Sequence, residues 1–304
     1  MPADVDGSAA DQRTVEAAAM LPAYGGVTGW AALHWCGAHW LAGRGRGGEL
    51  LPVPLAVGPG KALRAHAGIA VSQEGVPPGD LVRWDGVRVT VPVRSVAYEM
   101  RKALTDQDAI VAFEMAAFND LVSVDELAAH VESSLGTRHG VERVRRVLPD
   151  LEENSWSPME PVMRGIWVGE AGLPRPLANR PVFELDGRFI GTPDLIDAER
   201  GVAGEYDGAL HLVGAEHVRD VRREAEFRRV GLEPVTMLAG DLSDRRSFVR
   251  RLHEAYARAD RPDIARGWTL TPPAWWIETV TVEQRRALTP SQRARLLAHR
   301  SRAA

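Results

Sequence analysis

Residues 192–211 carry three carboxylates in a pattern that folds back on itself. The stretch reads TPDLIDAERGVAGEYDGALH, with short apolar segments on both sides of the Glu-Arg-Gly sequence at 199–201. Gly201 tolerates the positive φ that a tight turn needs. Two strands joined by so short a loop must be antiparallel neighbours. We therefore expect a two-stranded unit around this turn.

The hairpin brings Asp194, Glu205 and Asp207 together if the register puts all three on one face. Glu205 and Asp207 are two residues apart, so on a strand they share a face. Like charges at close range raise each other's pKa, and a hard divalent cation, Mg²⁺ or Mn²⁺, prefers such oxygen ligands. These three residues are thus predicted to bind metal. Alternatively, Asp194 ends a turn and Asp207-Gly208 is an ordinary turn pair.

Length and composition limit the other choices. With 304 residues, two domains are expected, and a net charge of −4 gives no global argument for nucleic acid. The single cysteine, Cys36, excludes a disulfide framework and a cysteine-based zinc site within one chain, and we expect it to be buried. No secretion signal is recognised, and no apolar run approaches the roughly 18 residues of a membrane span. The expected compartment is the cytoplasm.

The first part of the chain is expected to form a winged-helix-like domain over residues 1–95. Helical spacing at 12–21 and 29–41 surrounds a glycine turn, and Asp85-Gly86 is a two-residue hairpin signal between alternating strands. The second helix is largely apolar, which favours core packing over base recognition. A helical region follows over 96–150, with helices predicted at 96–104, 106–118, 124–133 and 141–148.

A second domain is predicted over residues 151–261. Ser157-Pro-Met-Glu160 has the pattern of a helix capping box. A hairpin at 181–191, the carboxylate strands, a helix at 216–230, a strand at 235–238 and a helix at 243–259 are expected to follow. Residues 262–304 are interpreted as a C-terminal extension, with Trp275-Trp276 in core or interface packing and a basic helix at 291–302.

Pro193-Asp194 and Glu205-x-Asp207, in this αβββαβ order, resemble the PD-(D/E)XK nuclease superfamily. The run from Glu205 to His211, Glu-Tyr-Asp-Gly-Ala-Leu-His, is similar to the branch related to the very short patch repair endonuclease. That branch also often carries a helix with an Asp and then an Arg, here Asp220 and Arg223. The match covers residues 157–259. The N-terminal half loosely resembles type IV abortive-infection antitoxin proteins of actinobacteria.

The resemblance implies an α/β (α+β) fold with a restriction-endonuclease-like αβββαβ core and a winged-helix-like and helical N-terminal part. It implies a Mg²⁺-dependent DNA endonuclease in phage defence or DNA processing. The implied catalytic residues are Glu160, Asp194, Glu205, Asp207 and His211, with the metal on the carboxylates of the hairpin. The superfamily usually has Lys at the third position, where this chain has Asp207, so His211 is the candidate for proton transfer. Helix capping alone also explains Glu160.

A second reading remains open. A degenerate nuclease domain, without the lysine, suits a non-enzymatic, antitoxin-like transcriptional regulator that binds DNA. The expected partner is nucleic acid, most simply DNA, with no membrane. A homodimer and, for the antitoxin reading, a toxin partner are further alternatives.

Overall fold

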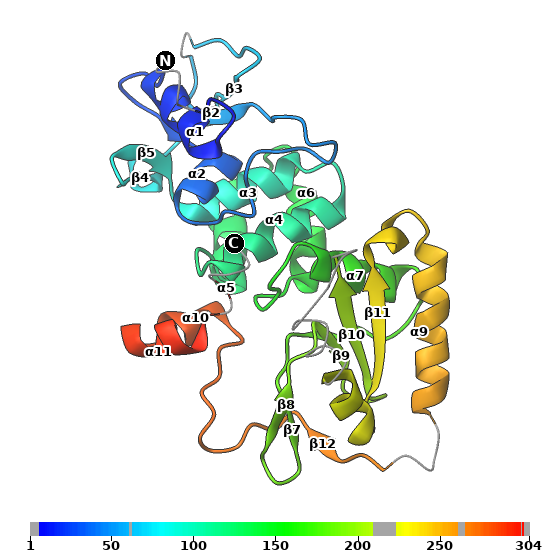
Figure 1. The fold of residues 1–304 in the computed structure, drawn as a ribbon. Helices are drawn as coiled ribbons and strands as arrows, with labels where there is room; N and C mark the ends of the chain where they lie inside the picture. The colour runs from blue at the N-terminus through cyan, green and yellow to red at the C-terminus, as the bar shows by residue number, and fades with distance from the viewer. Residues whose placement is uncertain (1–5, 61–62, 209–222, 261–264, 299, 301–304) are drawn as a thin grey trace. The chain divides into compact units, whose positions relative to one another are not determined.

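The computed structural model describes residues 6–60, 63–208, 223–260, 265–298 and 300 (Figure 1). The chain forms two compact units, Met1–Glu153 with Thr281–Ala304, and Asn154–Val280. Helices and sheets occur in both units, which confirms the mixed α and β class. The boundary between the units, at Glu153 and Asn154, lies close to the predicted one at 150 and 151, and segments 1–95 and 96–150 lie together in the first unit. The predicted extension at 262–304 is divided between the two units.

The first unit contains a five-stranded sheet in the order β3-β2-β1-β5-β4. Its strands are β1 (Gly26–Val27), β2 (Val53–Ala56), β3 (Ile69–Ser72), β4 (Leu81–Trp84) and β5 (Val87–Thr90). The predicted hairpin is confirmed, since β4 and β5 pair antiparallel and Asp85 and Gly86 both have positive φ, 43° and 81°. Such a pair of angles is typical of the tight turns that match strand twist. β5 also pairs with β1, so the hairpin is the edge of a larger sheet.

Helices complete the first unit. They are α1 (Ala10–Ala19), α2 (Gly29–Trp35), α3 (Pro92–Lys102), α4 (Asp106–Phe118), α5 (Val124–His130) with the π-helix η2 (Val131–Leu135), α6 (Val141–Val147), α10 (Val282–Arg286) and α11 (Pro290–Leu296), with the short 3₁₀ turns η1 (Pro78–Asp80) and η3 (Leu148–Asp150). The predicted capping box of α5 forms between Ser123 and Glu126. Strand β1 separates α1 from α2, so the two helices are not joined by a simple turn. α2 ends earlier than predicted because Gly37 has a φ of 106°, outside the helical region.

The C-terminal segment returns to the first unit and packs in its core. Val282 of α10 joins the apolar cluster that contains Met100 and Phe113. Its backbone N–H donates to the Glu153 carboxylate at 2.5 Å. Glu153 and Thr281 are the two ends of the first unit's chain at this boundary. The second unit is therefore an insertion whose two connections leave the first unit close together.

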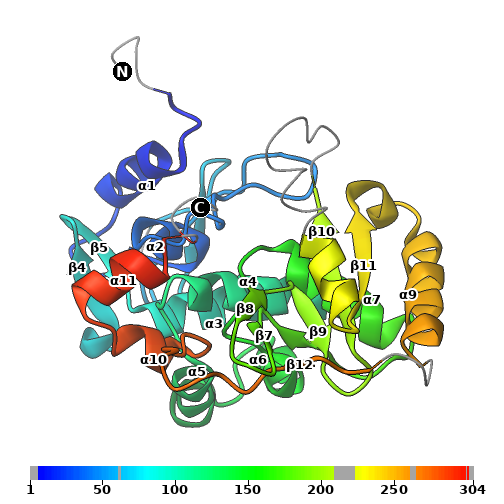
Figure 2. The same cartoon turned by 60° about the horizontal axis from the view of Figure 1, so that its bottom comes forward.

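The second unit is built on a four-stranded sheet in the order β11-β10-β9-β6. The elements are α7 (Met159–Gly169), β6 (Leu177–Ala178), β9 (Leu195–Asp197), β10 (Val202–Asp207), β11 (Glu233–Leu238), the 3₁₀ turn η4 (Ala239–Leu242) and α9 (Arg245–Ala259). As predicted, β9 and β10 are antiparallel neighbours around Gly201, whose φ is 72°. β10 and β11 are parallel, and residues 223–229, which are helical, fall between them in the sequence. Figure 2 shows β10 beside β11, with α9 next to β11.

The predicted hairpin at 181–191 belongs to a different sheet. Its strands β7 (Val182–Glu184) and β8 (Phe189–Gly191) are antiparallel and pair with β12 (Trp268–Thr269), in the order β12-β7-β8. β6, which the sequence did not predict, takes the place beside β9. The three strands expected before the helix therefore do not form one continuous sheet.

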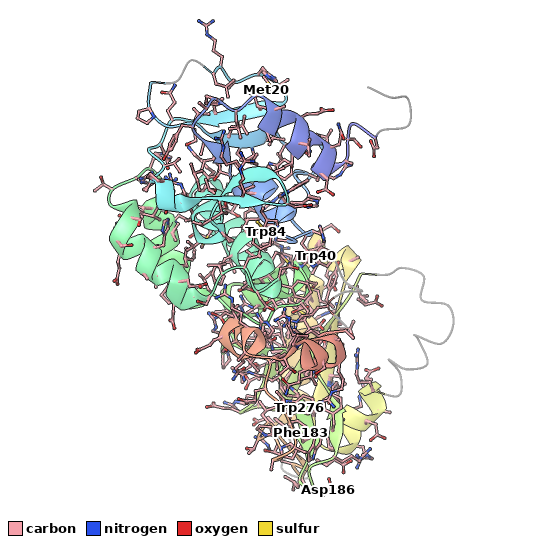
Figure 3. All side chains as sticks on the ribbon, turned by 90° about the vertical axis from the view of Figure 1, so that its left-hand side faces the viewer. Met20, Trp40, Trp84, Phe183, Asp186 and Trp276 are labelled. Atoms are coloured by element: carbon pink, nitrogen blue, oxygen red, sulfur yellow. The ribbon has the colours of Figure 1, made fainter. Side chains whose placement is uncertain are left out.

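Aromatic side chains cover the β7–β8 hairpin. Phe183 and Trp276 lie side by side in Figure 3, with ring centroids 5.0 Å apart. Trp276 also stacks on Phe189 at 5.3 Å. Trp275 contacts Trp276 but is 63% exposed. The Trp-Trp pair thus packs on the hairpin from the segment that follows β12.

Two apolar clusters mark the two faces of the four-stranded sheet. Trp167 of α7, Phe248 of α9 and Val202 of β10 belong to one cluster, and Ile196 of β9 and Phe227 to the other. Because side chains alternate along a strand, Val202, Gly204 and Tyr206 face α7 and α9. Glu205 and Asp207 consequently point to the face that carries Phe227.

Candidate active site

Asp194 directly precedes β9, and extending the register of β9 and β10 by one residue sets it opposite Glu205. The paired residues are Val202 with Asp197, Ala203 with Ile196, and Gly204 with Leu195. The next pair in this register is Glu205 with Asp194. Directly opposed residues of an antiparallel pair lie on the same face, with Cβ atoms about 5 Å apart. The fold therefore brings the Asp194 carboxylate to β10 at Tyr206, the residue after Glu205.

Asp194, directly before β9, is hydrogen-bonded to β10 and to the residue that follows β6. Its Oδ2 accepts a hydrogen bond of 2.7 Å from the backbone N–H of Tyr206. Its carbonyl oxygen accepts another, of 2.9 Å, from the backbone N–H of Asn179 directly after β6. Asp194 thus connects β6 and β10 through two hydrogen bonds from backbone N–H groups.

Glu160, the second residue of α7, is a buried carboxyl with only 3% exposure. Its Oε2 accepts hydrogen bonds from the Trp156 backbone N–H at 2.7 Å and from Asn179 Nδ2 at 2.5 Å. Burial, and then the negative charge of Asp194, raise the pKa of Glu160 well above its ordinary value, against the opposing hydrogen bonds. Glu160 and Asp194 therefore form an electrostatically coupled pair of acids.

The capping box predicted from Ser157 and Glu160 is not the one the structure forms. α7 begins at Met159, and its N-cap is Pro158, whose φ of −60° and ψ of −21° are already helical. No side chain caps this end of the helix. The Glu160 carboxylate accepts from the Trp156 N–H and from Asn179, and it also has a hydrogen bond with the Ser157 side chain.

Arg223 pairs with Glu205. Its Nη2 lies 2.6 Å from Glu205 Oε2, and the two side chains are 38% and 18% exposed. Gly191 makes room for this arginine, since a Cβ at 191 would lie 3.3 Å from Arg223 Cδ and 3.2 Å from the Phe227 ring. The predicted partner of Arg223, Asp220, lies outside the described residues, as does the candidate proton carrier His211.

Asp207 lies farther along β10, level with Leu238 of β11 and beyond the last residue paired with β9. By strand alternation it shares a face with Glu205. Together with burial, its charge raises the pKa of the neighbouring Tyr206 hydroxyl, with burial the larger cause. Asp207 therefore lies next to Tyr206, whose backbone N–H donates to the Asp194 carboxylate.

The residues suit a divalent cation with few protein ligands. Within the part of the chain that the structure describes, no three or more His, Cys, Asp or Glu side chains are grouped to hold a metal. Mg²⁺, however, is commonly bound by one or two carboxylates, with water and substrate phosphate as the remaining ligands. Asp194 and Glu205 provide such a pair, and the repulsion between Asp194 and Glu160 is relieved by a cation. The predicted three-carboxylate cluster is thereby reduced to a pair with Glu160 beside it.

Asn179 is a residue of this site that sequence reasoning missed. It is 2% exposed, has a φ of 45°, and also donates to the Asn154 carbonyl at 2.7 Å. Asn is among the residues that best tolerate positive φ. Its position in the sequence relative to the acidic residues, however, gave no sign that it belongs to the site. Only the pairing of β6 with β9 brings it to Asp194.

Comparisons with protein-family models, curated proteins and solved structures found no match. Among the described residues, no helix combines the length and apolar character that crossing a bilayer requires.

Proposed function

We propose that the second unit is a Mg²⁺-dependent phosphodiesterase that cleaves DNA as an endonuclease. The observation that carries the proposal is the Asp194 carboxylate bound to β10 at Tyr206, next to Glu205 in the chain, with the buried acid Glu160 near enough for the charge of Asp194 to raise its pKa. A buried acid with a strongly shifted pKa next to a second acid is a common feature of catalytic sites. The resemblance to the PD-(D/E)XK pattern supports the same activity.

The chain's own residues then have distinct roles. Asp194 and Glu205 would hold the ion, which when bound polarises the phosphate and lowers the pKa of the attacking water. The Tyr206 N–H orients Asp194. Glu160 retains its proton to a higher pH than an ordinary glutamic acid, so it can donate a hydrogen bond into the site. His211 is the proposed proton acceptor. Arg223 supplies positive charge for a phosphate next to Glu205.

A double substitution tests the activity. Plasmid and single-stranded DNA are incubated with increasing Mg²⁺ or Mn²⁺ and either the wild type or Asp194→Ala with Glu205→Ala. The matched control removes Glu199 and Asp244, one exposed Glu and one exposed Asp of the same unit. We expect metal-dependent cleavage by the wild type and the control only. Equal activity of the wild type and the D194A/E205A protein rejects the nuclease proposal.

A second candidate is a DNA-binding regulator without catalysis. It is favoured by the ion pair of Arg223 with Glu205, which neutralises one proposed ligand, and by Asp207 at the position of the usual lysine. This function is distinguished by salt-dependent binding to the protein's own promoter that metal does not change. An absence of DNA affinity at low salt argues against it.

A further inference from the structure

A small polar cavity in the first unit lies outside the proposed nuclease site. Helix α3 contributes Arg94, Tyr98 and Arg101, which share one face because they are spaced i, i+4 and i+7. The other lining residues are Thr28, Ala56, Ser72, Glu74, Leu135 and Arg138. The total space not filled by atoms is about 280 Å³. Most of this space is open to solvent or too narrow for a water molecule.

The cavity lies at a favourable place in the sheet. Ala56 and Ser72 are paired residues at the carboxyl ends of the parallel strands β2 and β3. In sheets with parallel strands, ligands bind outside the carboxyl ends of the strands. The position and the three arginines in the lining both indicate a binding site rather than a packing defect.

Three arginines share two carboxylates around this cavity. Arg94 donates to Asp80 at 2.9 Å and to the Gly75 carbonyl at 2.8 Å. Arg101 donates to both oxygens of Glu74, at 2.9 and 2.7 Å, and Arg138 donates to the same carboxylate at 2.8 Å. Three positive and two negative charges leave an excess of one positive charge.

The deepest arginine is not fully satisfied. Arg101 is 3% exposed, and its buried Nε has no hydrogen-bond partner within the described parts of the chain. A buried donor without an acceptor is costly, so an additional acceptor here is favourable. A carboxylate offers two oxygens, whereas a phosphate offers at least three and forms bidentate pairs with arginine.

We propose that this cavity binds a phosphate group and that the Glu74 carboxylate takes the place of the phosphate when no ligand is bound. The enclosed free space holds about one water molecule, so phosphate enters only as Glu74 leaves. Glu74 can leave, because it lies on the loop between β3 and η1 and its side chain is 27% exposed. Arg94, Arg101 and Arg138 then bind the phosphate oxygens.

Tyr98 adds a neutral donor. Burial, followed by the charges of Glu99 and Glu74, raises the pKa of the Tyr98 hydroxyl to about 12. The hydroxyl therefore stays protonated at neutral pH and can donate to a phosphate oxygen. The lining combines guanidinium and hydroxyl donors without a free carboxylate once Glu74 has moved.

Calorimetric titration with inorganic phosphate, at constant ionic strength against chloride, tests the site in the full-length protein. We expect saturable binding by the wild type and about tenfold tighter binding by Glu74→Gln, because the competing negative charge is removed. Asp106→Asn is the matched control, since Asp106 also binds two arginines, Arg143 and Arg146, but on the surface. Its affinity for phosphate should equal that of the wild type.

Two further measurements complete the test. Titration with a nucleoside 5′-monophosphate distinguishes the source of the phosphate: equal affinity indicates recognition of phosphate alone, and tighter binding indicates a nucleotide. Arg138→Gln, at a residue with 28% side-chain exposure, should abolish binding even if Glu74→Gln fails to fold. The proposal is overturned if the folded wild type shows no saturable phosphate binding, or if Arg138→Gln binds as tightly as the wild type.

Discussion

The Arg223 guanidinium lies 2.6 Å from the carboxylate of Glu205, the residue of β10 before Tyr206, whose backbone N–H donates to Asp194. A divalent cation at Glu205 must compete with this positive charge. We therefore expect Arg223→Ala to bind Mn²⁺ about three- to tenfold more tightly than the wild type, the modest size reflecting partial exposure of the pair. Metal titration by calorimetry measures the change.

Arg228→Ala is the control for this prediction, because Arg228 pairs with Glu224 in the same helix and is 52% exposed. Its Mn²⁺ affinity should match the wild type. An equal change in both variants would show that only the net charge of the unit matters.

Gly204 is required by the Trp167 ring. A Cβ at this position would lie 2.7 Å from a ring carbon of Trp167, which is fully buried between α7 and the sheet. Because neither the ring nor the strand has room to move, Gly204→Ala should destabilise the second unit by about 1–3 kcal/mol. Urea unfolding followed by tryptophan fluorescence measures the loss.

Gly169, the last residue of α7, provides the contrasting substitution. No atom lies within 4 Å of a Cβ built there. Alanine at 169 should leave stability unchanged or raise it by up to about 1 kcal/mol, since it reduces the freedom of the unfolded chain. A similar loss in both alanine variants would contradict the packing argument.

Arg285 anchors the returning C-terminal segment. Its side chain is 0% exposed and donates to Asp120 at 2.5 Å and to the carbonyl oxygens of Ala117 and Glu153 at 2.8 and 3.0 Å. Arg293 also pairs with Asp120, at 2.5 Å, so Asp120 keeps one partner when Arg285 is removed. Arg285→Ala should therefore cost about 2–3 kcal/mol of unfolding free energy, mainly from the lost buried hydrogen bonds, as measured by urea denaturation.

The adjacent Arg286 tests whether burial is the cause. It is 39% exposed, pairs with Glu126 at 2.7 Å and donates to the Asp120 backbone carbonyl, rather than its carboxylate, at 2.9 Å. Exposed ion pairs contribute about 0–1 kcal/mol, so Arg286→Ala should have little effect. If both variants lose the same stability, the buried network around Asp120 is not what holds the segment.

Glu99 should make the first unit pH-dependent. Burial raises its pKa from 4.5 to about 7, against the opposing hydrogen bond from the Trp30 N–H. A carboxyl with a raised pKa in the folded state contributes stability that is fully present below pH 4.5 and is lost as the pH rises through 7. Since Glu99 keeps some exposure, we expect a loss of about 2 kcal/mol.

Glu99→Gln should remove this loss, so urea unfolding at pH 5 and pH 8 should give more similar free energies than in the wild type. Glu160 is present in both proteins, so its contribution to the pH dependence cancels when the unfolding free energies of the wild type and Glu99→Gln are subtracted. Glu142→Gln, at a residue with a 75% exposed side chain, serves as the control and should keep the wild-type dependence. Parallel pH curves for the wild type and Glu99→Gln would refute the assignment.

Features that depend on a few neighbouring residues were predictable from the sequence. The turn at Asp85-Gly86, the capping box of Ser123 and Glu126, the full extent of α4 and the antiparallel pairing of β9 with β10 were all predicted and are present. Each of these features has a local physical cause that acts within one turn, one helix or one hairpin. The causes are a positive φ, a helix cap and the regular spacing of apolar residues.

Features that depend on distant parts of the chain were not predictable in this way. The sequence indicated a capping role for Glu160, yet its carboxylate is bound by Asn179, which β6 brings beside Asp194. It indicated a C-terminal extension, yet Val282 and Arg285 complete the core of the first unit.

The sequence by itself therefore determined the local elements and the antiparallel pairing of β9 with β10, since the short turn at Gly201 leaves those strands one way to pair. Only the tertiary structure showed that Glu160 and Asn179 lie beside Asp194 and that Arg223 pairs with Glu205. It also showed that the β7–β8 hairpin pairs with β12 in a separate sheet. The physical reason is that such long-range contacts depend on which apolar faces are buried together, a property of the whole chain that no local pattern records.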